Sequence, residues 1–202
     1  FNIENLVASL VVAEQAGFAL ADLIATVPEL KGAPGRMQVI RDDERLFVVD
    51  YAHTPDALAQ VLQSLKAHVE HQLWAVYGCG GDRDRGKRPE MTQAAIDFAD
   101  QVLMTTDNPR TEDPLQIFAD MKANLSDQIV DAENFHEIHD RRVAIKFAVQ
   151  QARAGDIVVI AGKGHENYQE IDGVRHWFDD VVEVQAAIDA QHCNSDSAYP
   201  AQ

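Results

Sequence analysis

The sequence has few cysteines, few basic residues and no long apolar run. Its two cysteines, Cys79 and Cys193, cannot form the disulfide framework of a small secreted domain, so we expect a reducing, cytosolic environment. Lys and Arg number 17 against 33 Asp and Glu, which gives a formal net charge of −16. A surface this acidic repels phosphodiester backbones and anionic lipids, which argues against nucleic-acid and membrane-surface binding. No apolar run of about 18 residues occurs, so no transmembrane helix is expected.

What the sequence does contain is enough for one globular domain and a piece of another. With 202 residues, 46% of them hydrophobic, the chain can bury a substantial core. It begins at Phe1 rather than Met and has no signal-peptide pattern, so we expect it to be part of a longer protein. The most linker-like stretch is Lys31-Gly32-Ala33-Pro34-Gly35. We therefore predict a terminal helical part (residues 1–34), a main domain (residues 35–190) and a disordered polar tail (residues 191–202).

Short apolar runs alternate with amphipathic segments along the main domain. Strands are predicted over residues 46–49, 73–77, 102–104, 135–138 and 157–160. Helices are predicted over residues 2–16 and 21–27 of the terminal part and over 55–66, 89–99, 114–125, 141–153 and 181–190 of the main domain. Asp172-Gly173 is typical of a two-residue hairpin turn between strands 168–171 and 174–177, and we expect this hairpin to add an antiparallel edge. The alternation indicates an α/β fold with a mostly parallel sheet and helices on both faces.

Four of the loops that follow predicted strands are rich in polar residues and glycine. They are residues 50–56, 78–88, 105–110 and 161–166. In parallel α/β sheets, ligands bind at the carboxyl ends of the strands. We therefore expect the four loops to contribute to one site on one rim of the sheet.

Several side chains in these loops suit a zwitterionic ligand. Arg110 can grip a carboxylate through two N–H groups, and Asn108 can both donate and accept. Arg83 would bind an acidic ligand, and Glu166 would pair with an ammonium group. Local geometry offers a second explanation, because Asn-Pro favours a turn and the glycines beside Lys163 allow a sharp strand-to-helix connection.

One loop comes close to a phosphate-binding P-loop. Gly81 to Lys87 has the spacing of that motif and lies between a predicted strand and a predicted helix. The next residue is Arg88, however, where a P-loop has the Ser or Thr that holds Mg²⁺. Asp82 and Asp84 would also place negative charge inside the phosphate cradle. We therefore predict a charged loop rather than a P-loop.

Other polar residues allow more than one interpretation. Asp50, directly after a predicted strand, is placed as ribose-binding acids are, but also as a turn-former or helix cap. His53 fits either a ligand contact or an ordinary loop histidine. His136 and His139 would lie on opposite faces of a strand, which argues against a metal site.

Taken together and in this order, the loop motifs resemble the C-terminal part of the Mur ligases, and within that family the members that use diaminopimelate. Phe1-Asn2-Ile3-Glu4-Asn5 is similar to the end of the family's central ATPase domain, and Gly35-Arg36-Met37 to the entry of its C-terminal domain. Any one motif is weak, but six in register are specific, and the resemblance runs from Phe1 to about Ala190. The loop motifs are Asp50-Tyr51-Ala52-His53-Thr54-Pro55, Gly80-Gly81-Asp82-Arg83, Asp107-Asn108-Pro109-Arg110 and Gly162-Lys163-Gly164-His165-Glu166.

The resemblance implies a Rossmann-like domain of an ATP-dependent, C–N bond-forming ligase. Such an enzyme acts in the cytoplasm in peptidoglycan synthesis and joins meso-diaminopimelate to UDP-N-acetylmuramoyl-L-alanyl-D-glutamate. ATP, with Mg²⁺, phosphorylates the glutamyl carboxylate, and the amine then attacks the acyl phosphate. The P-loop, the Mg²⁺ ligands and the UDP-binding domain of the family have no counterpart in this sequence, so the chain alone should not turn over ATP.

The resemblance also assigns residues. On the nucleotide side it implies Asn2 and Asn5 at the adenine, Asp50 at the ribose, Arg36 at the phosphates, and Tyr51 and His53 beside them. For diaminopimelate it implies Arg83, Asp107, Asn108, Arg110, Gly162 and Glu166. Arg110 is the expected specificity residue, because lysine lacks the distal carboxylate and would leave a buried guanidinium unpaired.

Two alternative functions remain at this point. A folylpolyglutamate-synthase-type ligase domain shares the fold but should lack the motif at residues 107–110. A stand-alone nucleotide-binding Rossmann-like module should carry Gly-x-Gly-x-x-Gly after its first strand, where this chain has Asp50-Tyr51-Ala52-His53.

Overall fold

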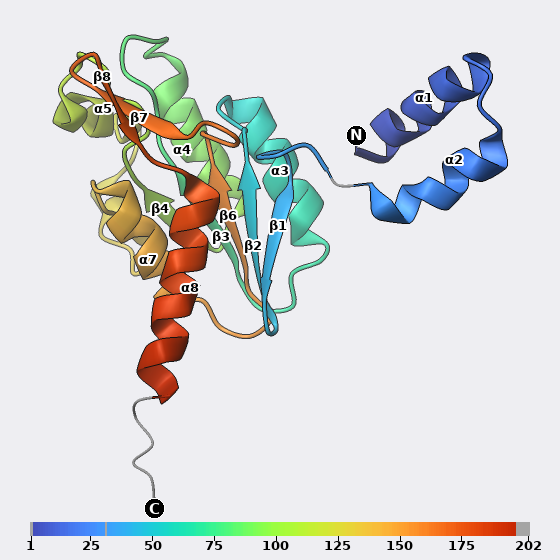
Figure 1. The fold of residues 1–202 in the computed structure, drawn as a ribbon. Helices are drawn as coiled ribbons and strands as arrows, with labels where there is room; N and C mark the ends of the chain where they lie inside the picture. Colours follow the sequence, from blue (N-terminus) through green and yellow to red (C-terminus); the bar gives the residue numbers. More distant parts are fainter. Residues whose placement is uncertain (1, 31, 197–202) are drawn as a thin grey trace, which may run out of the picture. The chain divides into compact units, whose positions relative to one another are not determined.

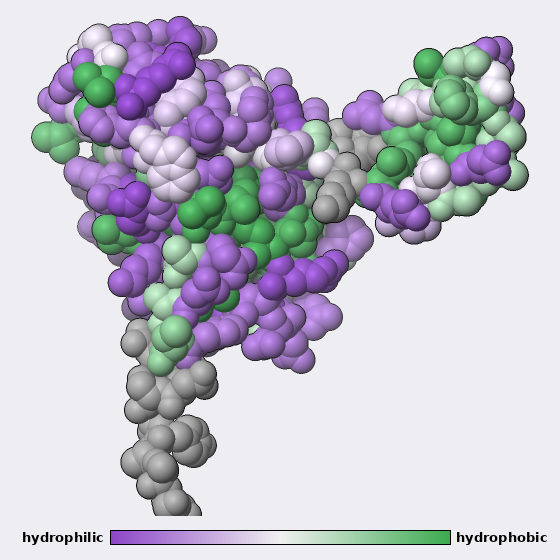
Figure 2. Space-filling view, viewed as in Figure 1, coloured by the Kyte–Doolittle hydropathy of each residue, from purple (hydrophilic) through white to green (hydrophobic). Residues whose placement is uncertain are grey.

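The computed structural model describes residues 2–30 and 32–196, and the chain separates into two compact units, Phe1–Ala33 and Pro34–Gln202. The first unit holds helices α1 (Asn2–Gln15) and α2 (Leu20–Thr26), followed by a 3-10 turn, η1 (Val27–Glu29). Both predicted helices are present. Val7, Val12 and Ile24 are among the apolar side chains of these helices that remain exposed. Figure 2 shows green, hydrophobic surface on this unit.

The second unit is built on a six-stranded sheet in the order β1-β2-β6-β3-β4-β5 (Figure 1). All neighbours pair in parallel except β1 and β2. The predicted α/β fold with a mostly parallel sheet is therefore confirmed. The strands are β1 (Gln38–Asp42), β2 (Arg45–Asp50), β3 (Leu73–Tyr77), β4 (Gln101–Met104), β5 (Phe135–Glu137) and β6 (Ile157–Ala161).

Helices pack on both faces of this sheet because its strands alternate their buried side chains between two cores. Val159 of β6 belongs to the core that contains Leu58 of α3 and Met91 of α4. Its neighbour Val158 belongs to the core that contains Ile145 of α7. The helices are α3 (Pro55–Lys66), α4 (Lys87–Phe98), α5 (Pro114–Met121), α6 (Asp127–Val130), α7 (Arg141–Gln151) and α8 (Asp180–Asp196).

Local sequence explains where three of these helices begin. The side chains of Thr54, Asp113 and Asp140 accept hydrogen bonds from backbone N–H groups in the first turns of α3, α5 and α7. Pro55 and Pro114 occupy the first helical position, where the missing N–H costs nothing. These starts place the loops before α3 and α5 at the carboxyl ends of β2 and β4.

The antiparallel part of the fold differs from the prediction. The hairpin of β7 (Tyr168–Ile171) and β8 (Val174–Trp177) has the predicted bounds, and both Asp172 and Gly173 have the positive φ that its turn requires. It forms a separate two-stranded sheet, however, and the antiparallel edge of the main sheet is the unpredicted strand β1. β1 is half exposed and carries no continuous apolar run, so the sequence gives little sign of it.

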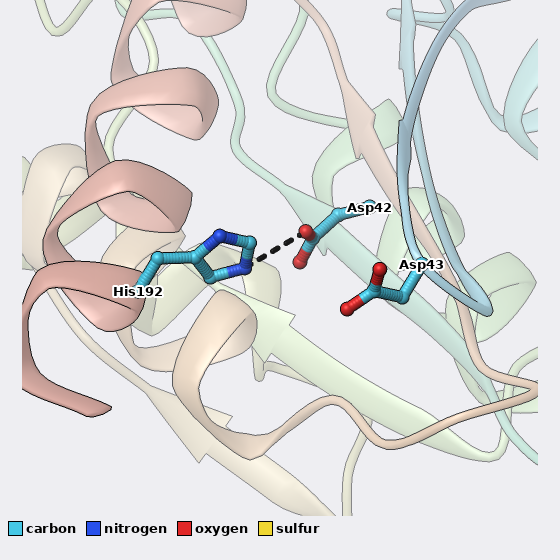
Figure 3. A group of neighbouring side chains, drawn as sticks. All are labelled: Asp42, Asp43 and His192. Carbon is cyan, nitrogen blue, oxygen red and sulfur yellow. Dashed lines mark ion pairs between the residues drawn. The ribbon is translucent and has the colours of Figure 1, made fainter. Parts of the chain in front are cut away.

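The end of α8 also differs from the prediction. The helix continues through residues 191–196, which were expected to be a disordered tail, while residues 197–202 lie outside the described residues. Polar side chains there bond to the β1–β2 turn: Arg45 Nη1 donates to Gln191 Oε1 at 3.0 Å, and His192 Nε2 lies 3.0 Å from Asp42 Oδ1 (Figure 3). These contacts hold the end of the helix to the sheet.

Asp42, Asp43 and His192 bring ligand atoms within 4.8 Å of one another (Figure 3). The guanidinium of Arg45 is also paired with the Asp42 carboxylate. A cation already occupies this carboxylate, so the group acts as a link between α8 and the sheet. No helix in residues 2–30 and 32–196 is long and apolar enough to cross a membrane.

Candidate functional site

A cavity of about 380 Å³ opens at the carboxyl edge of the sheet. Its walls come from the loops after β2, β3, β4 and β6, the four loops that the sequence singled out, and from Tyr168 of β7. Arg83, Asp107, Asn108, Arg110, Gly162 and Glu166 all line it. The residues expected to hold diaminopimelate are therefore together in space.

The loops after β3 and β4 pack backbone against backbone. Gly81 N donates to Asn108 O at 2.9 Å, and a Cβ on Gly81 would lie only 1.9 Å from Pro109 O. The glycine is needed for this close approach rather than for a phosphate. Lys87 Nζ donates to His53 O at 2.9 Å, so this lysine has a backbone partner as well. These contacts agree with the prediction that residues 81–87 are not a P-loop.

A buried arginine ties the same two loops together from below. Arg88 is fully buried and donates to Glu112, to Asp120 and to the carbonyl of Gly80. Glu112 also accepts from the backbone N–H of Asp82 at 2.6 Å. Hydrogen bonds from the Arg88 guanidinium lower the pKa of Glu112 to about 2. The network thus fixes the loops that present Arg83 and Arg110.

Arg110 is held in a constrained conformation. Its φ is 52°, a left-handed value that few non-glycine residues adopt. The hairpin fixes it, because Arg110 N donates to Glu170 O at 2.9 Å and Asp172 N donates to Arg110 O at 2.7 Å. The guanidinium reaches across the cavity wall, and Nη1 donates to Gly81 O at 2.7 Å. This clamp holds the base of the side chain at the cavity.

Asn108 and Glu166 lie side by side, with Lys163 behind them. Asn108 Nδ2 donates to Glu166 Oε2 at 3.0 Å. Lys163 is fully buried, and its Nζ lies 3.1 Å from Asn108 Oδ1 and 3.5 Å from Glu166 Oε2. Sequence reasoning assigns Lys163 no role, since a lysine between two glycines fits an ordinary turn. Lys87, Tyr168 and Cys79 also line the cavity without having been predicted.

Burial shapes the chemistry of Cys79. It raises the pKa of the thiol to about 12, so the thiol stays protonated at neutral pH. Cys79 therefore does not supply the cavity with a thiolate nucleophile. What the cavity offers a ligand is charge of both signs, from Arg83, Arg110 and Glu166.

The residues expected on the nucleotide side are more scattered. Tyr51 and His53 line the cavity, and the Arg36 guanidinium lies 4.7 Å above the Tyr51 ring. Asp50 is buried, and its two oxygens accept from the backbone N–H groups of Met37 and Ala52, each at 2.8 Å. This is the turn-forming role that the sequence left open, and a ribose contact for Asp50 stays a prediction.

The remaining polar candidates lie elsewhere. Asn2 and Asn5 belong to α1 in the first unit, so their adenine contacts also stay predictions. The ring of His136 stacks on Trp74, and His139 Nε2 lies 2.7 Å from Glu137 Oε1. The two histidines have separate partners. Because β5 ends at Glu137, His139 lies outside the strand, and the absence of a metal between them stays a prediction.

Comparison with known proteins identifies the family. The family described as "Mur ligase, glutamate ligase domain" matches residues 35–164. The chain belongs to the Mur ligase family. This Mur ligase chain is 48% identical, over 191 residues, to the UDP-N-acetylmuramoyl-L-alanyl-D-glutamate–2,6-diaminopimelate ligase of Ectopseudomonas mendocina, covering 94% of the chain and 38% of that relative.

Solved structures agree with this assignment. A structure of a UDP-N-acetylmuramoyl-L-alanyl-D-glutamate–2,6-diaminopimelate ligase is 74% identical with a TM-score of 0.76, over 95% of this chain and 39% of that one. The chain thus spans under two fifths of the length of these Mur ligases.

More distant structures share the fold alone. The folylpolyglutamate synthase of Thermotoga maritima is 20% identical, with a TM-score of 0.59 over 81% of this chain and 37% of that one. The MurF ligase of the same organism, solved with ADP, is 18% identical, with a TM-score of 0.57 over 95% and 38%. The folylpolyglutamate alternative therefore has less support than the Mur ligase assignment.

Proposed function

We propose that this chain is the amino-acid-binding domain of a cytoplasmic, ATP-dependent ligase that joins meso-diaminopimelate to UDP-N-acetylmuramoyl-L-alanyl-D-glutamate. The observation that carries the proposal is the convergence of Arg83, Arg110, Asn108 and Glu166, from three separate loops, on one cavity. The names of the 48% and 74% identical relatives, both diaminopimelate ligases, support the same substrate.

The charges of the cavity match the distal end of diaminopimelate. This end carries one carboxylate and one ammonium group. Arg83 and Arg110 can bind the carboxylate, and Glu166, with Asp107 and the Asn108 amide, can bind the ammonium. Gly162, with a φ of 117°, allows the ligand to approach the backbone. The other end of the ligand remains free to offer its amine to an acyl phosphate.

ATP and Mg²⁺ belong to the proposed reaction, but the described residues do not supply a phosphate cradle. Gly81 is packed against Pro109, Lys87 is bonded to His53, and Arg88 stands where a P-loop has a hydroxyl. On this chain, Arg36, Asp50, Tyr51 and His53 would meet the nucleotide, together with Asn2 and Asn5. When bound, ATP supplies the phosphoryl group that activates the carboxylate.

Calorimetric titration of the full chain with meso-diaminopimelate and with L-lysine tests the proposal. Lysine should bind about 100-fold more weakly or worse, because it leaves guanidinium groups unpaired. Arg110→Ala should weaken diaminopimelate binding by about 10- to 100-fold, since a hydrogen bond to a charged group contributes roughly 1.5–3 kcal/mol. Arg153→Ala, an exposed arginine absent from the cavity lining, is the matched control and should change nothing.

A chimera tests the same function in a complete enzyme. The chain replaces the matching 191 residues of the Ectopseudomonas mendocina relative, and phosphate release is measured with each amino acid. Release should depend on meso-diaminopimelate and on Arg110. Equal responses to lysine and diaminopimelate, or release unaffected by Arg110→Ala, would contradict the proposed substrate.

A further inference from the structure

Lys163 is a buried charge shared between two carboxylates, those of Asp107 and Glu166. Its side chain is fully inaccessible to solvent. The carboxylates near it, on Asp107 and Glu166, lie at 3.4 and 3.5 Å, both longer than a good ion pair, and its shortest polar contact is to the neutral amide of Asn108 at 3.1 Å. Burying an ammonium group is costly, and replacing a buried ion pair by apolar residues is often neutral or stabilising. The long ion pairs of Lys163 are therefore weak evidence for a role in stability.

What Lys163 does achieve is to fix which way the Asn108 amide points. Asn108 Oδ1 accepts from two donors, Lys163 Nζ at 3.1 Å and the backbone N–H of Glu170 at 3.0 Å. Both demand an oxygen at this position, so the Nδ2 group must occupy the other side. There it donates to Glu166 Oε2 at 3.0 Å. Without Lys163, one donor alone would have to hold the amide.

The consequence reaches the cavity through Glu166. Its Oε2 faces Asn108 Nδ2 and Lys163, whereas within residues 2–30 and 32–196 no group bonds its Oε1. The side chain is 22% exposed and lines the cavity. One oxygen is thus held by the protein, and the other remains as an acceptor for a ligand. Lys163 itself does not line the cavity.

We propose that Lys163 is a positioning residue that orients the Asn108 amide and, through it, the Glu166 carboxylate for the distal ammonium group of the amino-acid substrate. The proposal rests on the proposed function and deepens it. Arg83 and Arg110 bind the distal carboxylate, and Lys163 positions the groups that bind the ammonium beside it. Replacing Lys163 should therefore weaken recognition of the distal ammonium group and leave recognition of the distal carboxylate unchanged.

Three ligands separate the two halves. Meso-diaminopimelate has both distal groups, L-lysine lacks the distal carboxylate, and L-α-aminopimelate lacks the distal ammonium. Titrated into the full chain, Lys163→Met should bind meso-diaminopimelate about ten-fold more weakly than the unmodified chain. Its affinity for α-aminopimelate should change less than about three-fold. The preference for the ammonium-bearing ligand should therefore collapse.

Matched variants show whether the effect is positional. Lys163→Gln keeps a donor without the charge and should restore part of the preference. Arg110→Ala should give the opposite pattern, losing the preference over lysine while keeping the preference over α-aminopimelate. Equal loss of affinity for all ligands in Lys163→Met, or no loss, would overturn the proposal, because a purely structural role does not distinguish ligands.

Two further outcomes are decisive. If the unmodified chain does not prefer meso-diaminopimelate over lysine, both the proposed function and the proposed role of Lys163 are wrong. If the preference is present, the Lys163 variants test the positioning role alone. Should both Lys163→Met and Lys163→Gln fail to fold, NMR of the Asn108 side-chain amide in the unmodified chain tests whether the amide is fixed. Slow exchange of the Nδ2 protons with solvent supports a fixed amide, and fast exchange refutes it.

Discussion

The two ends of β6 each hold a buried charge, and they use it differently. Asp156 precedes the strand and is 1% exposed. Its Oδ1 accepts from His71 Nδ1 at 2.6 Å and from Gln72 N at 2.9 Å, while its Oδ2 accepts from Trp74 Nε1 at 3.2 Å and Arg153 N at 2.9 Å. Both oxygens are occupied. A hollow of about 250 Å³ borders this end, but the Asp156 carboxylate has nothing left to offer a ligand.

At the other end, Lys163 follows the strand, and the groups around it are only partly satisfied. Within residues 2–30 and 32–196, Glu166 bonds to the protein through one oxygen, and the one hydrogen bond of the Arg83 side chain is a long contact, 3.5 Å, to Asp82 O. A polar network that closes on itself stabilises a fold, whereas one that leaves donors and acceptors facing a cavity binds something else. The comparison predicts that mutations at the Asp156 end change stability, and those at the Lys163 end change ligand selection.

The largest stability effect is expected at Asp156. Asp156→Ala leaves the N–H groups of Gln72, Trp74 and Arg153 without an acceptor, and should lower the free energy of unfolding by roughly 3–5 kcal/mol. Urea denaturation followed by circular dichroism measures it.

Asp156→Asn, which keeps one carbonyl oxygen, should lose less and serves where the alanine variant does not fold. The ratio of meso-diaminopimelate to lysine affinity should be unchanged in the folded fraction. If Asp156→Ala lowered the free energy of unfolding by less than about 1 kcal/mol, or if the ratio of the two ligand affinities changed, the contrast between the two ends of β6 would be wrong.

A middle-sized effect is expected at Glu112, which joins the Arg83 and Arg110 loops. Glu112→Gln should cost roughly 1–3 kcal/mol at pH 7, because the bonds to the buried Arg88 lose their charge. The pKa of Glu112 is lowered from 4.5 to about 2 in the fold, so its stabilisation is present above pH 4.5 and is lost as the pH falls towards 2.

The pH dependence gives Glu112 a specific signature. Urea curves of the two proteins should differ most at neutral pH and converge as the pH approaches 2. Glu133→Gln, at an exposed acid, should follow the unmodified chain at every pH. A constant difference across this range would mean that Glu112 acts by shape and not by charge.

The same contrast explains what could be predicted from the sequence. Strands such as Ile157–Ala161 are continuous apolar runs, and the Asp172-Gly173 turn has a local signature, so both were predicted correctly. β1 was missed because an edge strand that is half exposed needs no apolar run. The polar end of α8 was misjudged because the partners of Gln191 and His192, Arg45 and Asp42, are distant in sequence.

The candidate site divides in the same way. Its loops could be predicted because the carboxyl ends of parallel strands share one rim, and the resemblance supplied the residue roles. The buried residues that hold the loops in place, Lys163 and Arg88, could not be predicted, because they contact residues up to 56 positions away in the sequence. Nothing in a single sequence distinguishes a buried lysine from a solvated one when glycines flank it.

The smallest effect is expected at His71, the solvent-side partner of Asp156. Its side chain is 45% exposed, and Asp156 Oδ1 keeps the N–H of Gln72 when the ring is removed. His71→Ala should therefore cost only about 0.5–1 kcal/mol, the contribution of a single hydrogen bond. Paired urea curves at pH 7 measure it. Lys163→Met likewise removes a partner of an acidic residue, Glu166, but we expect it to change ligand preference rather than stability. A loss above about 2 kcal/mol for His71→Ala would show that the closed network depends on its exposed member as much as on its buried ones.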